Sequence, residues 1–400
     1  MEIIWLIFRR AALAILCIAA LGFLYLYFVK FAHPTEVSKL EDVKDMDWHT
    51  IAMSGNTLCS DGSAYEIYMR KGSSENLIVY FAGGGACWDS YTASKPISLL
   101  SIFDGSSKNL KSFYFPKLQW FYPIAMGGIG DCKDSKNAFK DWNIVFIPYC
   151  TGDMHIGNTT RTYVFKGRRI VIHHNGRNNS LAALDWVFEN LKNPGKIIVA
   201  GESTGAFASA FYTPFVADHY PGKKVYALCD GAMLSSDRWK EILDTVWNAD
   251  SKSNLGFTIG KDIFEDALIH RSDSEKRQIR FLHSNTLYDD VFPKFSAVLN
   301  HKSTEDHMFI NEWAANTRAT MQRLAHAEID YHYFLTDWGY DAKRHATQHT
   351  LTTNEFYHAC TADGISYAQW LKRNVIDDEQ LSLGQKLLEK ELIENENRKK

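Results

Sequence analysis

A serine nucleophile is predicted at Ser203, in the stretch Gly201-Glu202-Ser203-Thr204-Gly205, which fits the pattern G-x-S-x-G. The four apolar residues 197–200 predict a buried strand before it, and residues 206–216 can form a helix after it. A sharp turn between a strand and a helix holds the serine hydroxyl clear of the backbone, and flanking glycines remove side chains that would collide there. The alternative is a glycine-rich turn without chemistry, so the rest of the chain has to supply the partners of a nucleophile.

A serine nucleophile needs a base at neutral pH, and the base needs a carboxylate that orients it. In α/β-hydrolases the acid and then the histidine follow the serine along the chain. Asp230 and Asp289 each follow a predicted strand, and Asp290 is a near rival of Asp289. We favour Asp289 because it comes late enough to face a histidine loop. Asp230, directly before Gly231, is expected to form a turn that supports the serine helix.

The base is expected in the stretch 344–349, which offers His345 and His349. Their i, i+4 spacing is typical of zinc-binding helices, but Ala346 stands where the H-E-x-x-H motif has its glutamate. We therefore expect no metal. No cofactor is expected either, because neither G-x-G-x-x-G nor a P-loop is present at the glycine-rich stretch 83–85. On spacing alone, both histidines remain candidates.

The tetrahedral intermediate of acyl transfer needs hydrogen-bond donors for its oxyanion. One donor is the backbone N–H of the residue after the nucleophile, here Thr204. An early glycine-rich loop usually supplies the others, and Gly83-Gly84-Gly85 directly follows the apolar run 77–82. The sequence therefore predicts a complete acyl-transfer site.

The elements that position these residues alternate between strands and helices. Strands are predicted at 66–69, 77–82, 142–148, 169–173, 197–200, 224–229, 279–283 and 331–335. Helices are predicted at 179–191, 307–328 and 365–373, with a mostly helical cap at 236–275. Apolar strands of this kind are typical of a mostly parallel sheet covered by helices on both faces. We therefore expect an α/β-hydrolase-like α/β fold with its site at the C-terminal ends of the strands.

The N-terminal part of the chain predicts a membrane anchor. Residues 11–29 carry no charge, and at about 1.5 Å per residue they span roughly 28 Å, close to the thickness of a bilayer core. Arg9 and Arg10 favour a cytoplasmic position for residues 1–10 and an extracytoplasmic position for the remainder. We predict an uncleaved, single-pass transmembrane signal anchor, with a cleaved signal peptide as the alternative. Residues 30–56 are then a stalk, residues 57–376 the catalytic domain and residues 377–400 a charged helical tail.

Composition sets further bounds. The 400 residues are 46% hydrophobic, enough for a large core, and the net charge of −3 gives no sign of nucleic-acid binding. Cys17 lies in the predicted anchor; the other six cysteines are Cys59, Cys87, Cys132, Cys150, Cys229 and Cys360. An even number in an exported domain predicts up to three disulfides, the alternative being that several cysteines are free and buried.

Several motifs together resemble the pectin acetylesterase family, which includes plant pectin acetylesterases and the Notum carboxylesterases. The matching stretches follow the family order and cover residues 57–373: they are 80–88 (YFAGGGACW), 147–157 (IPYCTGDMHIG), 201–205 (GESTG), Tyr288-Asp289, and His349 with Phe356-Tyr357 and Trp370-Leu371 after it. The resemblance implies an α/β-hydrolase-like fold and a Ser-Asp-His triad. In that triad Ser203 is the nucleophile, Asp289 the acid and His349 the base, since the family histidine stands shortly before the F-Y pair.

The resemblance also implies which residues surround the nucleophile. The oxyanion amides would belong to Gly84, Gly85 and Thr204. Many relatives have alanine in place of Thr204 and glycine in place of Ala206, so we expect a pocket of altered shape. The aromatic residues Trp88 and Phe207 are candidates for lining it.

These observations predict a membrane-anchored, extracytoplasmic serine carboxylesterase. Its expected substrate is an acetylated polysaccharide, by analogy with the family. One alternative is deacylation of a lipid or a lipidated protein, as in the Notum branch. Another is a non-catalytic glycan-binding protein on the same fold. We expect no nucleic-acid partner.

Overall fold

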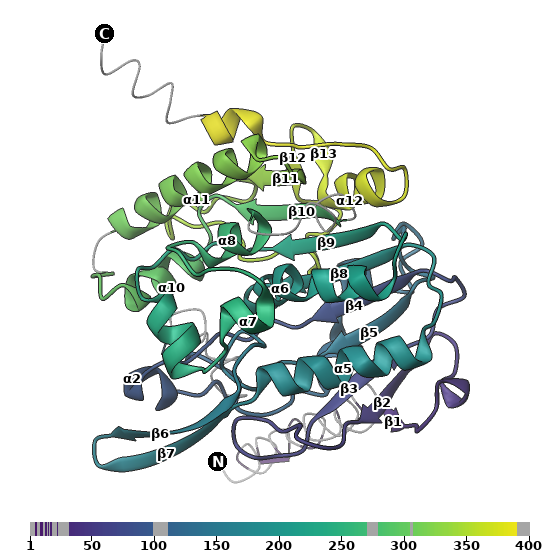
Figure 1. Ribbon diagram of the computed structural model, residues 1–400, viewed down its shortest axis with the longest axis horizontal. Helices are drawn as coiled ribbons and strands as arrows, with labels where there is room; N and C mark the ends of the chain where they lie inside the picture. Colours follow the sequence, from purple (N-terminus) through teal and green to yellow (C-terminus); the bar gives the residue numbers. More distant parts are fainter. Residues whose placement is uncertain are drawn as a thin grey trace.

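A nine-stranded sheet forms the centre of the protein (Figure 1). The computed structural model describes residues 32–98, 111–269, 279–304 and 307–389, together with single positions before residue 32. The strand order is β1-β2-β3-β5-β4-β8-β9-β10-β11. The strands are β1 (Thr35–Glu36), β2 (Trp48–Ala52), β3 (Glu66–Arg70), β4 (Leu77–Phe81), β5 (Asn143–Ile147), β8 (Ile197–Glu202), β9 (Val225–Asp230), β10 (Ile279–Thr286) and β11 (Asp330–Thr336). The six strands from β5 to β11 in this order are parallel, and β3 is antiparallel to both of its neighbours.

Helices connect these strands. They are α2 (Ser90–Ala93), α4 (Phe121–Ala125), α5 (Gly176–Asn190), α6 (Thr204–His219), α7 (Ser251–Leu255), α8 (Ile263–Ile269), α10 (Phe292–Leu299), α11 (Met308–His326) and α12 (Tyr367–Val375). Short 3₁₀ turns occur at Leu40–Asp42 and Gly128–Gly130, and a π-helix at Glu241–Val246. Two two-stranded sheets lie outside the central one: β6 (Thr159–Phe165) with β7 (Arg168–His174), and β12 (Thr361–Ala362) with β13 (Ile365–Ser366).

The sheet is buried on both faces. In β4, Val79 and Phe81 belong to one apolar core together with residues of α5, α6, α8 and α11. The alternate residues Ile78 and Tyr80 belong to a second core that includes α12. A parallel sheet covered on both sides needs apolar residues at every position of its central strands. The predicted mostly parallel α/β sheet with helices on both faces is therefore confirmed, and Figure 1 shows α5 and α6 packed across it.

Two pieces of the segment predicted as a stalk belong to the sheet. β2 pairs with β3 in antiparallel register from Trp48 to Ala52, and β1 extends this edge. β2 includes the buried polar residues His49 and Thr50, so its composition does not resemble that of an apolar strand. Residues 35–52 therefore correct the expectation of an extended stalk over 30–56.

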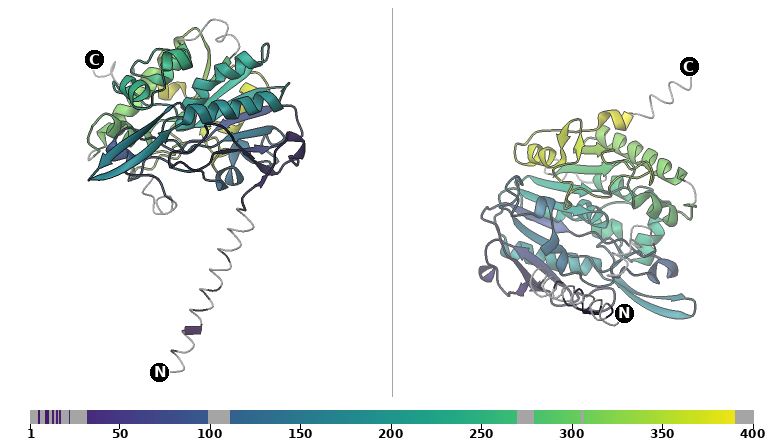
Figure 2. Two further views of the ribbon diagram at one scale, coloured as in Figure 1. Left: turned by 60° about the horizontal axis from the view of Figure 1, so that its bottom comes forward. Right: turned by 180° about the vertical axis from the view of Figure 1, so that it is seen from behind.

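The predicted strand 169–173 exists as β7, but it pairs with β6 rather than with the central sheet. The two form a hairpin that projects from the body of the protein, at the lower left of Figure 1 and, seen from behind, at the lower right of the right view in Figure 2. Apolar composition predicted a strand here, and only the tertiary structure shows which strand it pairs with.

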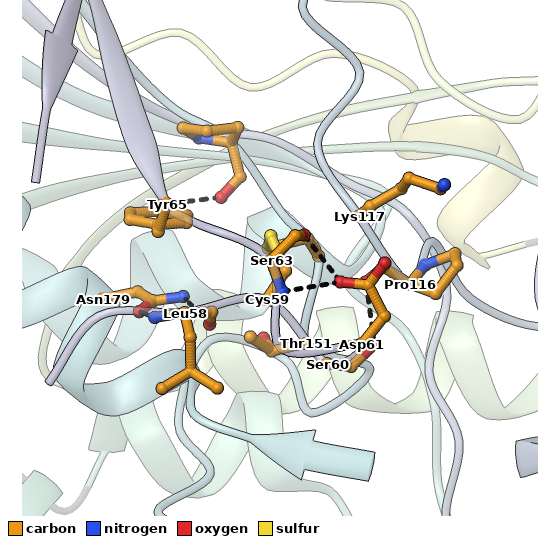
Figure 3. The surroundings of a disulfide bond; sticks show 12 residues. Leu58, Cys59, Ser60, Asp61, Ser63, Tyr65, Pro116, Lys117, Thr151 and Asn179 are labelled. Atoms are coloured by element: carbon orange, nitrogen blue, oxygen red, sulfur yellow. Dashed lines mark hydrogen bonds between the residues drawn. A yellow bond between two sulfur atoms is a disulfide. The ribbon is translucent and has the colours of Figure 1, made fainter. Parts of the chain in front are cut away.

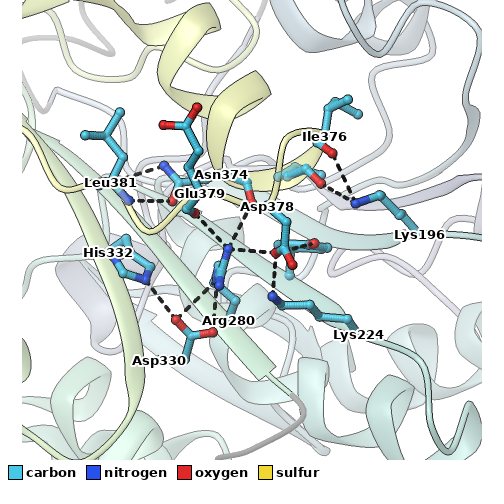
Figure 4. A network of polar contacts seen from close by, with 12 residues as sticks. Lys196, Lys224, Arg280, Asp330, His332, Asn374, Ile376, Asp378, Glu379 and Leu381 are labelled. Carbon is cyan, nitrogen blue, oxygen red and sulfur yellow. Dashed lines mark hydrogen bonds and ion pairs between the residues drawn. The ribbon is translucent and has the colours of Figure 1, made fainter.

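The C-terminal segment is docked to the sheet through Arg280 of β10 (Figure 4). The Arg280 guanidinium pairs with Asp330 at 3.0 Å and with Asp378 at 3.0 Å. It also donates to the carbonyl oxygens of Asn374 and Glu379. The start of the predicted charged tail, residues 377–384, is therefore non-helical and held against β11, where Leu383 forms a bridge with Phe334.

One disulfide is present among the described residues, between Cys59 and Cys150 (Figure 3). It joins the loop before β3 to the segment after β5. Cys87, Cys229 and Cys360 are free and buried, and Cys132 is free and partly exposed. Three disulfides are therefore not formed, and the alternative of buried free thiols holds for most of the remaining cysteines.

The predicted anchor at residues 11–29 lies almost entirely outside the described residues. In the part of the chain that is described, no helix is both long and apolar enough to cross a bilayer.

Candidate active site

Ser203 occupies a strained turn between β8 and α6. Its backbone has φ 55° and ψ −125°, an uncommon conformation for a residue with a side chain. The flanking glycines are required by close backbone approach: a Cβ on Gly201 would lie 2.0 Å from the carbonyl oxygen of Gly205. A Cβ on Gly205 would lie 2.1 Å from the carbonyl oxygen of Phe81. The G-x-S-x-G pattern thus has a steric reason in this fold.

Asp289 follows β10 and contacts His349. Nδ1 of His349 lies 2.6 Å from Oδ2 of Asp289, and the carboxylate is almost fully buried. The other oxygen, Oδ1, accepts from the amides of Val291 (2.8 Å) and Phe292 (2.7 Å). This carboxylate is therefore fixed by the start of α10 before it orients the imidazole.

The second ring nitrogen of His349, Nε2, is buried and has no hydrogen-bond partner among the described residues. Because Asp289 accepts at Nδ1, Nε2 is the nitrogen left to exchange a proton with a substrate or nucleophile. Burial alone would lower the pKa of His349. The carboxylates of Asp289, Asp290 and Asp230 outweigh burial and raise this pKa to about 9.

Ser203 and His349 line one cavity of about 490 Å³, at the C-terminal ends of the parallel strands. Gly83, Gly84, Gly85 and Thr204 line the same cavity. Topology brings together residues that are up to 266 positions apart, counted from Gly83 to His349. Asp289 lies behind the imidazole rather than on the cavity wall.

The rival residues make different contacts from Asp289 and His349. His345 packs against His307 with ring centres 4.3 Å apart, and it is not on the cavity wall. Asp290 lines the cavity, and its carboxylate lies 3.7 Å from Nη1 of Arg344. Within the described ranges, no group of three or more His, Cys, Asp or Glu side chains is arranged to hold a metal ion.

Asp230 links the serine turn to the histidine loop. Its backbone carbonyl accepts from the Ser203 amide at 2.8 Å. Oδ2 accepts from the amides of Leu351 (2.7 Å) and Thr352 (2.8 Å), and Oδ1 accepts from the hydroxyl of Ser284 (2.7 Å). Support of the serine turn was expected from the sequence. The contact with the histidine loop was not, because those residues follow about 120 positions later.

The predicted oxyanion donors are not equivalent. The Gly84 amide donates to Oγ1 of Thr204 at 3.1 Å. Thr204 is the first residue of α6, where amides have no intrahelical acceptor. Gly85 has φ 74°, and a Cβ there would lie 1.9 Å from the carbonyl oxygen of Phe113. The Gly84 amide is therefore held by the Thr204 side chain, whereas the Thr204 amide has no acceptor within its helix.

The two aromatic residues suggested for the pocket lie behind its wall. Trp88 packs edge-on against Phe295 with centroids 5.1 Å apart, and Phe207 packs against Phe292 at 6.3 Å. Phe292 and Phe295 line the cavity, whereas Trp88 and Phe207 do not. These two lining aromatics come from α10, which the sequence did not distinguish from the surrounding segment.

Comparison with known proteins adds independent information. The model of the pectinacetylesterase family matches residues 39–242, just over half of the chain. The chain is 26% identical to palmitoleoyl-protein carboxylesterase notum2 of Xenopus laevis over 216 residues, which are 52% of this chain and 38% of that protein. It is also 26% identical to pectin acetylesterase 7 of Arabidopsis thaliana over 222 residues, 53% of this chain and 46% of that protein. The aligned region thus spans less than half the length of either relative.

The family match contains the glycine-rich loop and Ser203 but ends before Asp289 and His349. The positions of these last two residues therefore rest on the geometry described above.

Proposed function

The chain belongs to the pectinacetylesterase family, and from this premise we propose that it is a serine carboxylesterase acting through an acyl-enzyme. The observation that carries the proposal is the 2.6 Å contact between Nδ1 of His349 and Asp289, with Nε2 unpaired beside a cavity that Ser203 lines. This arrangement supports a base that is oriented on one side and available on the other.

In the proposed reaction, Nε2 of His349 takes the proton of Ser203 as Oγ attacks the acyl carbon. The amides of Thr204 and Gly85 stabilise the oxyanion. The intermediate collapses and expels the alcohol, which receives the proton from Nε2. A water molecule, deprotonated by the same nitrogen, then attacks the acyl-enzyme; the bond to Ser203 breaks, Oγ receives the proton from Nε2, and the carboxylic acid is released. Asp289 keeps the imidazole in the tautomer that these steps need.

We propose an acetyl group on a polysaccharide as the substrate, in line with the relative named as a pectin acetylesterase. A longer acyl chain is the second candidate, in line with the palmitoleoyl-protein carboxylesterase. Ile97, Phe113, Phe292 and Phe295 give the cavity an apolar wall, and its volume of about 490 Å³ far exceeds that of an acetyl group. An apolar wall of this size suits a longer acyl chain, so we keep it as the second candidate.

The direct test compares wild type, Ser203→Ala and a matched control, Ser73→Ala, which changes an exposed serine before β4. We expect Ser203→Ala to lose p-nitrophenyl acetate hydrolysis and Ser73→Ala to keep it. Equal rates for wild type and Ser203→Ala would instead support a non-catalytic glycan-binding protein. A series of p-nitrophenyl esters from two to twelve carbons separates the two substrates: a maximum at two carbons supports deacetylation.

We further propose attachment to a membrane through residues 11–29, with the catalytic domain outside the cytoplasm. The Cys59–Cys150 disulfide fits an oxidising compartment. The full chain should stay with membranes during alkaline carbonate extraction, and Leu16→Arg with Leu21→Arg should release it. Release of the wild-type chain from the membranes by carbonate would refute the anchor.

A further inference from the structure

One wall of the cavity is polar and is not used by the proposed chemistry. Tyr80 of β4, Glu202 at the end of β8 and Thr353 of the histidine loop line it together. The Tyr80 ring stacks on Phe146, which also lines the cavity, with centroids 5.4 Å apart. Glu202 directly precedes Ser203, so this polar wall adjoins the nucleophile.

Tyr80 is 1% exposed, and its hydroxyl has no hydrogen-bond partner of acceptable geometry among the described residues. Burial and the nearby Glu202 carboxylate raise the pKa of Tyr80, so the hydroxyl keeps its proton and remains a donor. An unpaired buried hydroxyl destabilises a protein, and such groups usually find a partner. Since this one lines a cavity, a bound ligand can be its partner.

Glu202 has one oxygen engaged and one that can accept. Oε2 accepts from the Thr353 hydroxyl at 2.7 Å. Thr353 thereby fixes the carboxyl group and leaves its second oxygen available beside the Tyr80 hydroxyl.

The ligand group that satisfies both residues must accept from Tyr80 and donate to Glu202. A neutral hydroxyl does both through one oxygen atom. An ammonium group would donate to Glu202 but could not accept from Tyr80. An acyl chain would leave both polar groups unpaired, and the apolar wall of Phe113, Phe292 and Phe295 suits it better.

We propose that Tyr80 and Glu202 form a subsite for a free hydroxyl on the alcohol part of the ester, so that the enzyme prefers esters of sugars over esters of simple alcohols. This inference rests on the proposed esterase function and adds a determinant of its specificity. The hydroxyl would stand near the ester-bearing carbon, because Glu202 and Ser203 are consecutive.

The test compares two acetate esters whose alcohols are six-membered rings: a mono-O-acetylated methyl xyloside and cyclohexyl acetate, which has no free hydroxyl. We expect wild type to favour the sugar ester in kcat/KM. Tyr80→Phe and Glu202→Gln should each reduce this preference about tenfold, the effect of losing one hydrogen bond to a substrate. The matched control is Tyr357→Phe, because Tyr357 is also 1% exposed and unpaired but lies off the cavity. That variant should keep the wild-type preference.

The proposal is overturned if both Tyr80→Phe and Glu202→Gln keep the wild-type preference while folding normally. In that case Ser203-dependent hydrolysis of cyclohexyl acetate would still stand, so the esterase function would survive. If wild type hydrolyses neither ester, the proposed esterase function is refuted. The subsite is then tested by a binding measurement. Methyl xyloside, followed by saturation-transfer NMR, should then bind wild type about tenfold more tightly than Tyr80→Phe, and equal binding would refute the subsite.

Discussion

Replacing Asp230 tests whether one buried carboxylate holds the catalytic loops in register. In Asp230→Ala, the amides of Leu351 and Thr352 lose their acceptor, and both residues are fully buried. Leaving a buried donor unpaired destabilises by about 1–3 kcal/mol. The hydroxyls of Ser284 and Thr352 each have Tyr367 as a second partner and lose less. The free energy of unfolding should therefore fall by about 4 kcal/mol.

Asp230→Asn should be milder. Its carbonyl oxygen can still accept from the Leu351 and Thr352 amides, and its NH₂ group can donate to Ser284, which passes its own hydrogen to Tyr367. Replacing charge-assisted hydrogen bonds with neutral ones should cost about 1–2 kcal/mol. Urea unfolding followed by tryptophan fluorescence measures both variants.

Activity separates positioning from stability. His349 stands two residues before Leu351, so release of this loop should displace the imidazole. A displacement of about 1 Å can lower kcat about a hundredfold, and we expect this for the folded fraction of Asp230→Ala. The matched control is Asp262→Ala, which removes a buried carboxylate bonded to the Thr320 hydroxyl at 2.7 Å, away from the cavity. That variant should lose stability but keep kcat.

The reasoning would be refuted if Asp230→Ala unfolded at the same urea concentration as wild type, or if its folded fraction kept the wild-type kcat. The first result would mean that the amides find other acceptors. The second would mean that the histidine loop holds its place without Asp230.

Three further predictions follow from the geometry. Because the carboxylates around His349 raise its pKa to about 9, and only the neutral ring acts as a base, kcat/KM should rise with pH until about 9, measured with p-nitrophenyl acetate after correction for spontaneous hydrolysis. Removing the Cys59–Cys150 disulfide, which closes a separation of 91 residues, should lower the free energy of unfolding by about 4–5 kcal/mol, measured with the double serine variant. Gly85→Ala should unfold about 2 kcal/mol more easily and lose most activity, because its Cβ would collide with the Phe113 carbonyl oxygen at 1.9 Å and its φ of 74° is strained for alanine.

Each of these has a contradicting outcome. A pH–rate profile that levels off near pH 6.5 would mean that the surrounding carboxylates do not raise the pKa of His349. The same pKa shift also affects stability: a histidine whose pKa is higher folded than unfolded stabilises fully below about pH 6.5, and this is lost as pH rises to about 9. A serine double variant as stable as wild type, or an active Gly85→Ala enzyme, would refute the other two.

Short stretches of sequence determine the local features of this protein. The strands β4, β5, β8 and β9 are short runs of mostly apolar residues, because they are buried on both faces. The serine turn is equally local, since its two glycines and the strand before it are adjacent in the chain. Sequence alone thus predicted the central strands of the sheet, several of its helices and Ser203 as a candidate nucleophile.

The edge of the sheet and the pairing of the strands were predicted less well. The strand β1 has only two residues and β2 contains the buried polar residues His49 and Thr50, so neither forms an apolar run, and the sequence assigned both to a stalk. The β6–β7 hairpin has ordinary strand composition, yet it leaves the sheet. Pairing depends on the partner strand as well as on the strand itself.

The site shows the same division. Sequence patterns and family resemblance selected Asp289 and His349, whereas spacing alone left His345 open. Their contact across 60 positions at 2.6 Å exists only once β10 and the histidine loop are packed side by side. Asp230 gives the clearest contrast. The sequence placed it at a turn after a strand, but its two long-range tasks, supporting the Ser203 amide and accepting the amides of residues 351–352, depend on atoms brought together by the fold. Short-range sterics and burial act on neighbouring residues and can be predicted from the chain; hydrogen bonds between distant loops are decided by tertiary structure.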